Sequence, residues 1–221
     1  KYTVLIVGDS FTYGSWADDS GVWPTLLQQM DMQLNVLNLA VRGYGTEMAI
    51  MLDMHIDEYN PDLVIIAFIS DNLYRSTLRF RDYWKPRYVL DKNNLVRNGT
   101  PVPELPLGAA QVQSYLKVYS LLNKSRFLGL ALNVYTELAN KFSSQPTNEE
   151  RKLNQLIFEK MVNMAKQYDT EILLLYLPVG IELVNGEFTQ NGECFLSDFV
   201  SSHSVMGLNP RHHFLEKKQA Y

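Results

Sequence analysis

The chain has 221 residues, of which 46% are hydrophobic and 20% are charged, and its formal net charge is −4. These values are typical of a globular domain with a full-sized core. The charges are interspersed and slightly acidic, which argues against a nucleic-acid partner, because such proteins usually present a basic stripe. No apolar run approaches the roughly 18 residues of a membrane span. We therefore expect a small or uncharged molecule as the partner.

The first third of the chain alternates apolar runs with helical patterns. Residues 2–7, 34–39 and 63–69 are predicted strands, the first and third continuously apolar, and residues 21–30 and 46–59 are predicted helices. Continuous apolar strands are typical of strands buried on both faces of a parallel sheet. The pattern predicts an α/β fold, a flavodoxin-like three-layer α/β/α arrangement around a parallel central sheet.

The rest of the chain predicts an insertion followed by further α/β elements. An irregular insertion spans about residues 75–110 and contains a β-hairpin over residues 87–97. We expect one domain over residues 1–221, with no internal repeat. The further expected elements are helices over residues 114–142 and 146–168, a strand over residues 170–177 and a short fifth strand over residues 193–198.

The clearest chemical signal is the loop Gly8-Asp9-Ser10-Phe11-Thr12-Tyr13-Gly14, which directly follows the first predicted strand. Ligands of open α/β sheets bind beyond the carboxyl ends of the strands. There the Ser10 hydroxyl could act as a nucleophile, and its backbone N–H could hold an oxyanion. Taken alone, Asp9-Ser10 is equally compatible with an ordinary turn. The loop matches neither a phosphate-binding loop, nor a dinucleotide fingerprint, nor a G-x-S-x-G elbow.

Two further loops follow the next two strands. In Asn38 to Glu47, Gly43 could present a backbone N–H without a side chain in the way, and in Ser70-Asp71-Asn72 an amide could be another oxyanion donor. Each of these loops alone is more typical of a turn or a helix cap. Because the carboxyl ends of neighbouring parallel strands meet at one edge, we expect the three loops to converge.

Together these three segments resemble the SGNH (GDSL-type) hydrolases. The resemblance implies that Ser10 is the nucleophile and that Ser10, Gly43 and Asn72 donate to the oxyanion. It also implies an acyl-enzyme mechanism without a metal or cofactor, acting on an ester such as an acylated carbohydrate or lipid. The third block departs from the family pattern Gly-x-Asn-Asp, because it reads Ser70-Asp71-Asn72. Asp71 could therefore occupy the place of the donor, where a carboxylate would oppose an oxyanion.

The family's Asp-x-x-His block, which supplies the base, is not found after Pro178. His203 is one candidate for the base, and His212-His213 is a weaker one, in which case Gly207 matches the family histidine. We favour a different hypothesis, in which Cys194 to Asp198 is the last strand and the catalytic Asp and His lie beyond Tyr221. His55 is expected to pack on a helix.

Several functions remain open at this point. The first is a serine esterase, and the second an O-acyltransferase of the same fold. The third is a binding module that has lost its base, and a nucleotide binder is disfavoured because Asp9 would oppose a phosphate. The aromatic insertion, with Tyr74, Phe80, Tyr83, Trp84 and Tyr88, could be a sugar platform or could pack the hairpin onto the sheet.

Overall fold

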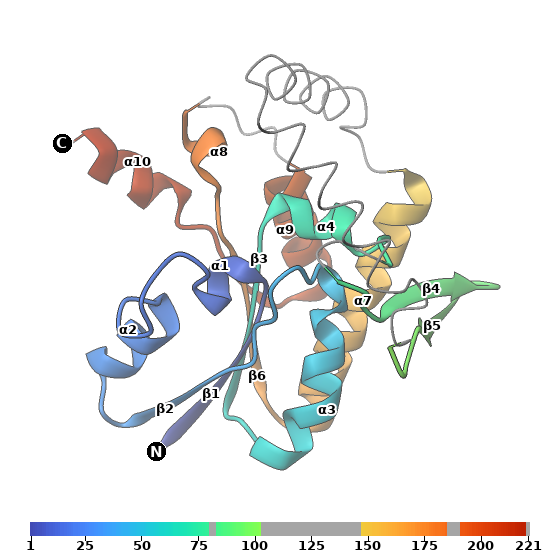
Figure 1. Cartoon of the computed structure of the whole chain (residues 1–221), viewed down its shortest axis with the longest axis horizontal. Helices are drawn as coiled ribbons and strands as arrows, with labels where there is room; N and C mark the ends of the chain where they lie inside the picture. The colour runs from blue at the N-terminus through green and yellow to red at the C-terminus, as the bar shows by residue number, and fades with distance from the viewer. Residues whose placement is uncertain (80–82, 103–146, 185–190, 220–221) are drawn as a thin grey trace, which may run out of the picture.

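The computed structural model describes residues 1–79, 83–102, 147–184 and 191–219 (Figure 1). Its main sheet has five parallel strands in the order β2-β1-β3-β6-β7. The strands of this sheet are β1 (Tyr2–Val7), β2 (Leu34–Asn38), β3 (Leu63–Phe68), β6 (Glu171–Tyr176) and β7 (Met206–Leu208). The parallel α/β sheet expected from the sequence is confirmed.

Helices cover both faces of this sheet, which makes three layers. Figure 1 shows α3 and α7 on one side of the sheet and α2 on the other. The helices are α1 (Ser10–Tyr13), α2 (Trp23–Met30), α3 (Ala49–Tyr59), α4 (Ser70–Arg75), α7 (Asn148–Gln167), α8 (Gly180–Val184), α9 (Asn191–His203) and α10 (Arg211–Gln219), with a 3-10 turn η1 (Thr46–Met48) before α3.

The side-chain alternation of the strands divides the core in two. Leu5 and Val7 of β1 face the side of α3, α7 and α9, whereas Val4 and Ile6 face the side of α2. All four side chains are at most 2% exposed. Because successive residues of a strand point to opposite faces, a strand buried on both sides must be apolar throughout. This explains why these strands could be recognised from the sequence.

The predicted hairpin is confirmed as an antiparallel pair, β4 (Arg87–Asp91) and β5 (Asn94–Asn98). Tyr88 of β4 is only 3% exposed and packs in the core, so it is not part of an exposed platform. The helix expected after residue 146 is also confirmed as α7. The helix expected over residues 114–142 lies outside the described residues.

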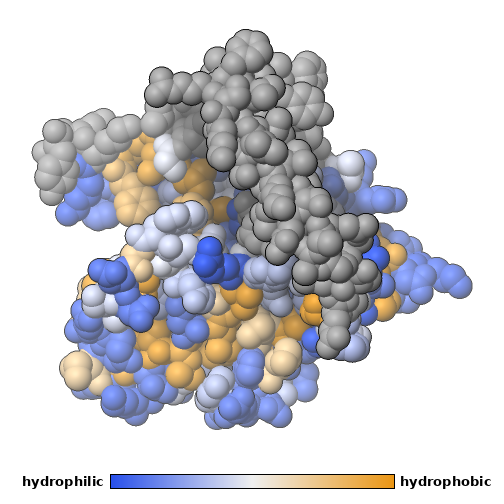
Figure 2. Space-filling model, viewed as in Figure 1, coloured by the Kyte–Doolittle hydropathy of each residue, from blue (hydrophilic) through white to orange (hydrophobic). Residues whose placement is uncertain are grey.

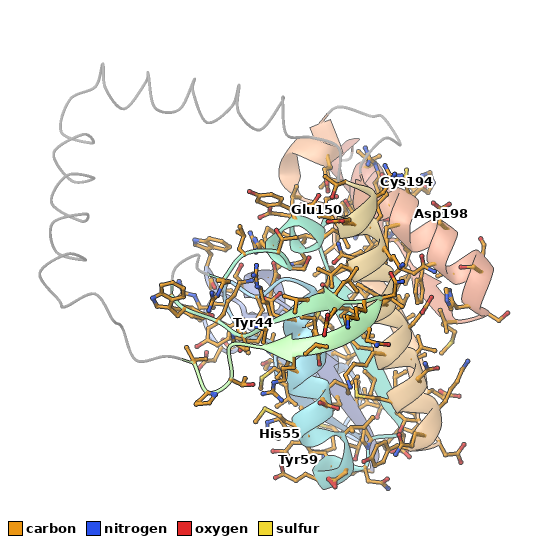
Figure 3. All side chains as sticks on the ribbon, turned by 90° about the vertical axis from the view of Figure 1, so that its right-hand side faces the viewer. Tyr44, His55, Tyr59, Glu150, Cys194 and Asp198 are labelled. Atoms are coloured by element: carbon orange, nitrogen blue, oxygen red, sulfur yellow. The ribbon has the colours of Figure 1, made fainter. Side chains whose placement is uncertain are left out.

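The expected fifth strand at residues 193–198 is wrong, because this segment belongs to α9. Phe195 and Phe199, four residues apart, point from one side of α9 onto Phe158 of α7 with ring centroids 4.8 and 5.6 Å away. A short apolar run does not distinguish a strand from a buried helix. Figure 3 shows Cys194 and Asp198 on this helix beside α7, and the Cys194 side chain is exposed rather than buried as a small hydrophobe would be. The actual fifth strand is β7.

Candidate active site

Ser10 opens α1 and is separated from the end of strand β1 only by Gly8 and Asp9. The carboxylate of Asp9 caps this helix by accepting the N–H of Phe11 at 2.9 Å. The side-chain amide of Asn38, at the end of β2, donates to the carbonyl of Thr12 at 3.0 Å. The first and second loops are thus bonded to each other, as their places on adjacent strands led us to expect.

The hydroxyl of Ser10 is partly exposed and makes no hydrogen bond to any other residue that the structure describes. Its backbone N–H and that of Gly43 are likewise without a hydrogen bond to the described part of the chain. Gly43 has a φ of +75°, a backbone conformation that favours glycine. The edge of the sheet therefore carries, on neighbouring loops, a hydroxyl and two backbone donors that have no partner among the described residues.

Next to Ser10 in the chain begins a polar group that we call the Asp9 cluster, formed by the buried residues Asp9, Asn72 and Arg75 and by the more exposed Asp71. Oδ2 of Asp9 accepts hydrogen bonds from the Asn72 amide and from the Arg75 guanidinium, both at 3.0 Å. Burial raises the pKa of Asp9, and the hydrogen bonds from Phe11 and Asn72 and the Arg75 charge oppose that rise. The cluster fixes the first loop to the third.

Asn72 is completely buried, and its side chain is fully used. Its second amide hydrogen bonds the carbonyl of Tyr44 at 3.0 Å, and its oxygen accepts the N–H of Ile69 at 2.7 Å. An amide has two hydrogens to donate, so in this arrangement none is left for an oxyanion. The role of Asn72 as an oxyanion donor stays a prediction, and its observed contacts hold the three loops together.

Asp71 is the more exposed of the two candidates in the third loop. Its side chain is 46% exposed, and its carboxylate pairs with Arg75 at 2.5 Å. Arg75 is itself 7% exposed and thus bridges Asp71 and Asp9. The guanidinium neutralises much of the negative charge that a carboxylate brings to this loop.

A buried ion pair joins Glu47, at the end of the second loop, to Lys85 of the insertion. Both side chains are 1% exposed. The Lys85 ammonium also donates to the carbonyl of Arg75 at 2.8 Å, and Glu47 accepts the N–H of Gly45 at 2.9 Å. Burial raises the pKa of Glu47, and the charge of Lys85 opposes that rise. The insertion is therefore tied to both the second and the third loop.

His55 and His203 both lie away from Ser10. His55 bonds Glu58 at 3.0 Å. Figure 3 shows His55 toward the end of α3 that is farther from Tyr44, and Tyr44 directly follows Gly43. His203 pairs with Glu159 at 3.2 Å and stacks on Phe199 with ring centroids 4.0 Å apart. It precedes β7 by three residues and so lies toward the amino ends of the strands. The structure does not bring His203 to Ser10.

His212 and His213 lie in the first turn of α10, after the carboxyl end of β7. His212 is 88% exposed and pairs with Glu216 at 3.0 Å, and neither histidine makes a hydrogen bond to Ser10. Gly207 lies within β7, and a Cβ there would stand 2.6 Å from a methyl group of Val200 on α9. A side chain at position 207 would thus collide with α9, so this position does not suit a catalytic base.

A second polar group at the same edge was not anticipated from the sequence, and we call it the Ser70 cluster. The carboxylate of Glu182 accepts the hydroxyls of Ser70 and Tyr176, both at 2.7 Å. The Ser70 oxygen also lies 2.9 Å from the Tyr176 hydroxyl and accepts the N–H of Gly192 at 3.2 Å. Burial raises the pKa of Tyr176, and Glu182 adds to that rise. Ser70 is more than 100 residues before the other members, so no local pattern of the sequence reveals the cluster.

Among the described residues, no group of three or more histidine, cysteine, aspartate or glutamate side chains is arranged to hold a metal ion. The part of the chain that the structure describes also has no helix long and apolar enough to cross a membrane.

No family model and no curated protein matches the sequence. Solved structures do match. TesA aligns with a TM-score of 0.52 at 14% identity over 93% of this chain and 76% of its own. AlinE4, an SGNH-hydrolase family esterase, aligns with a TM-score of 0.51 at 11% identity, over 94% of this chain and 75% of the AlinE4 chain. A Ser-to-Ala mutant of Axe2, an acetylxylan esterase from Geobacillus stearothermophilus, aligns with a TM-score of 0.51 at 11% identity. The alignment covers 100% of this chain and 81% of the Axe2 chain.

The chain has the SGNH-hydrolase fold. The fold class and the family resemblance expected from the sequence are thereby confirmed. At these low identities the likeness establishes the fold, and the chemistry has to be argued from the residues at the carboxyl edge.

Proposed function

We propose that the chain is an ester hydrolase of the SGNH type that acts through an acyl-enzyme on Ser10. The observation that carries this proposal is the free hydroxyl of Ser10 beside two unpaired backbone donors of the described chain, its own N–H and that of Gly43. Acyl transfer requires a nucleophile and donors for the tetrahedral oxyanion at one place. Two of the matched structures, AlinE4 and Axe2, are esterases, which supports the same reaction class.

In the proposed reaction the Ser10 oxygen attacks the acyl carbon while a base takes the hydroxyl proton. The resulting oxyanion is held by the N–H groups of Ser10 and Gly43. When the intermediate collapses, the alcohol leaves with the proton, and water then cleaves the acyl-serine by the same steps. Asn72 would become a third donor if the amide hydrogen that bonds the Tyr44 carbonyl bonded the oxyanion instead. Transfer to a sugar hydroxyl instead of water would give the related O-acyltransferase.

In this proposal the base is an Asp-oriented histidine that is none of the four histidines of residues 1–221. Its support is the position of the four histidines in the sequence, since two lie away from Ser10 and two lie on α10 without a bond to it. Cys194 to Asp198 lends no support as a last strand, because this segment belongs to the helix α9. The same observation on the histidines favours the second candidate, a binding module of this fold without a base.

Fluorophosphonate labelling followed by mass spectrometry tests the proposal. The 221-residue chain, the full-length protein from the natural gene and their Ser10→Ala variants are compared, with Ser70→Ala as the control for a second serine at the same edge. We expect rapid labelling of Ser10 in the full-length protein only, because losing a triad member costs on the order of 10⁴ to 10⁶ in rate. Equally fast labelling of the 221-residue chain would overturn the assignment of the base. A full-length protein that does not label at Ser10 would favour the binding module.

A further inference from the structure

Exposed aromatic side chains gather at one edge of the sheet. Among the described residues, seven aromatic side chains are substantially exposed, and six of them follow the carboxyl ends of strands or contact the loops that do. Tyr2, at the amino edge, is the exception. The six are Phe11, Tyr13, Trp16, Tyr74, Tyr83 and Phe214. A gathering of exposed aromatic area at the end of a domain where ligands bind indicates a binding surface.

Trp16 is the most exposed of these side chains, at 82%. Its ring meets that of Phe11 in an edge-to-face arrangement, with centroids 6.0 Å apart and planes at 72°, and its high exposure leaves most of the indole accessible to a ligand. The N–H groups of Gly14 and Ser15 both bond the carbonyl of Ser10 at 3.1 Å. These bonds tie the backbone of the two residues before Trp16 to the carbonyl of Ser10.

The turn that carries Trp16 admits only glycine at its centre. Gly14 has a φ of +88°, and a Cβ at this position would stand 1.9 Å from a methyl group of Val22. Such a contact with a buried side chain at the start of α2 cannot be relieved without moving that helix. The backbone of the turn two residues before Trp16 is thus constrained by its packing on Val22.

Two further exposed aromatic side chains lie on α4 of the third loop and in the insertion that is bonded to it. Tyr74 on α4 is 53% exposed, and Tyr83 is 39% exposed. Burial raises the pKa of Tyr44 in the second loop, and Tyr83 adds to that rise. Figure 2 shows that the molecule is indented at this edge, between the part that holds α1 and α2 and the part that holds α8 and α10. We call Trp16, Phe11, Tyr13 and Tyr74 the aromatic rim.

The chemistry of the rim favours a carbohydrate over a fatty acyl chain. Exposed carboxylates accompany the rings, at Asp18 and Asp19 beside Trp16 and at Asp71 one turn before Tyr74. Aromatic faces pack on the apolar faces of sugar rings, and carboxylates and phenols bond sugar hydroxyls. An acyl chain would instead need an aliphatic lining. The exposed aliphatic side chains are mostly elsewhere, for example Leu26 and Met30 on α2.

We infer that the aromatic rim binds the sugar part of the substrate, so that the ester cleaved at Ser10 is carried on a neutral carbohydrate and Trp16 is a specificity-determining residue. This inference rests on the proposed function for the ester, but sugar binding itself needs neither Ser10 nor a base. Binding can therefore be measured on the 221-residue chain independently of any reaction.

Isothermal titration calorimetry with xylohexaose, cellohexaose and hexa-N-acetylchitohexaose tests the inference, with decanoate as the acyl-chain probe. We expect at least one oligosaccharide to bind and Trp16→Ala to weaken it by about 10-fold or more, as for aromatic anchors elsewhere. Met30→Ala is the matched control, because Met30 is 83% exposed on α2 and should leave binding unchanged. Circular dichroism and the melting temperature of each variant confirm that it is folded.

The outcomes separate this inference from the proposed function. If none of the three oligosaccharides binds, or if Trp16→Ala binds as well as the parent, the inference is overturned. Binding of decanoate alone that depends on Trp16 would replace the sugar by an acyl chain. Sugar binding without Ser10 labelling of the full-length protein would leave the rim in place and refute the hydrolase. Ser10 labelling of the full-length protein without sugar binding would support the hydrolase and overturn the inference about the aromatic rim.

Discussion

Two serines follow neighbouring strands at the same edge of the sheet, and their hydroxyls are in opposite situations. Ser70 bonds Glu182 and accepts the N–H of Gly192, and its oxygen lies 2.9 Å from the Tyr176 hydroxyl, so its hydrogen-bonding capacity is used. Ser10 has no hydrogen-bond partner for its hydroxyl among the described residues, although the buried carboxylate of Asp9 precedes it directly. A nearby carboxylate therefore does not distinguish the two serines, whereas a hydroxyl without a partner among the described residues does, and our proposal takes Ser10 as the nucleophile for that reason.

The two surroundings also differ in how their charges are compensated. Beside Ser10, the carboxylates of Asp9 and Glu47 are matched by the buried cations of Arg75 and Lys85. Beside Ser70, the buried carboxylate of Glu182 is held by hydroxyls and the N–H of Val179. Removing one member of a buried ion pair leaves an uncompensated buried charge. Removing a hydroxyl donor instead leaves one buried acceptor with one hydrogen bond fewer. We therefore expect the surroundings of Ser10 to be the more sensitive to substitution.

The largest effect is expected from Lys85→Met. The variant removes the cation from a pair in which both side chains are 1% exposed, and the buried Glu47 carboxylate keeps its bond to the N–H of Gly45. We expect a loss of about 3–5 kcal/mol in the free energy of unfolding at pH 7, measured by urea denaturation. Lys85→Met combined with Glu47→Gln should recover much of the loss. A single variant as stable as the parent would show that the pair does not hold the second loop.

The same variant gives a pH dependence with a definite sign. Burial raises the pKa of Glu47 and Lys85 lowers it, so Lys85→Met should raise that pKa further. The folded state then keeps the proton after the unfolded chain has lost it. Stability is thus present below the ordinary carboxyl pKa and is lost as the pH rises to the folded pKa of Glu47. Unfolding at pH 5 and pH 8 should show a steeper fall for Lys85→Met than for the parent or for the double variant.

The parts that the sequence predicted well are those buried on both faces. Leu5 and Ile66 belong to strands that are apolar at nearly every position, and such runs have few other interpretations. The loops after these strands stood out because glycine and aspartate mark turns. The amino-acid pattern alone was therefore enough to place Ser10 and Gly43 at one edge of the sheet.

The carboxyl-terminal part could not be predicted in the same way, for two physical reasons. The edge strand β7 has three residues, all exposed, so no hydrophobic pattern marks it. The apolar run at Phe195 is buried by Phe158 and Phe68, contacts that depend on the tertiary packing of α9. The engagement of the Asn72 amide by Asp9 and Tyr44 is equally a product of the assembled loops.

A smaller effect is expected from Gly45→Ala, which tests how tightly the second loop packs on the third. A Cβ at position 45 would stand 2.6 Å from both the carbonyl oxygen of Asn72 and the backbone nitrogen of Ser76. Backbone atoms cannot move aside as a flexible side chain can, so we expect about 1–3 kcal/mol of destabilisation in thermal and urea unfolding.

Gly180→Ala is the matched control for this variant, because a Cβ there meets no described atom within 4 Å and the residue lies in α8. It should be neutral or slightly stabilising. If both glycine variants unfold alike, the close contact between the second and third loops is not a constraint on the site.

The smallest effect is expected from Tyr176→Phe in the Ser70 cluster. The change removes one hydroxyl that bonds Glu182, whose carboxylate keeps its bonds to Ser70 and to the N–H of Val179. We expect a loss of about 1–2 kcal/mol in the free energy of unfolding, and Tyr13→Phe, at an exposed residue, should cost less than about 0.5 kcal/mol.

The same variant sharpens the distinction between the two serines, because it removes one neighbour of the Ser70 oxygen. The Ser70 hydroxyl still donates to Glu182, and its oxygen still accepts the N–H of Gly192, so it should not react with a fluorophosphonate in the full-length protein. Mass spectrometry of the labelled Tyr176→Phe variant checks this. Labelling of Ser70 in this variant would mean that removing one hydrogen-bonding neighbour is enough to make a serine at this edge reactive. The lack of a hydrogen-bond partner would then no longer distinguish Ser10 from Ser70.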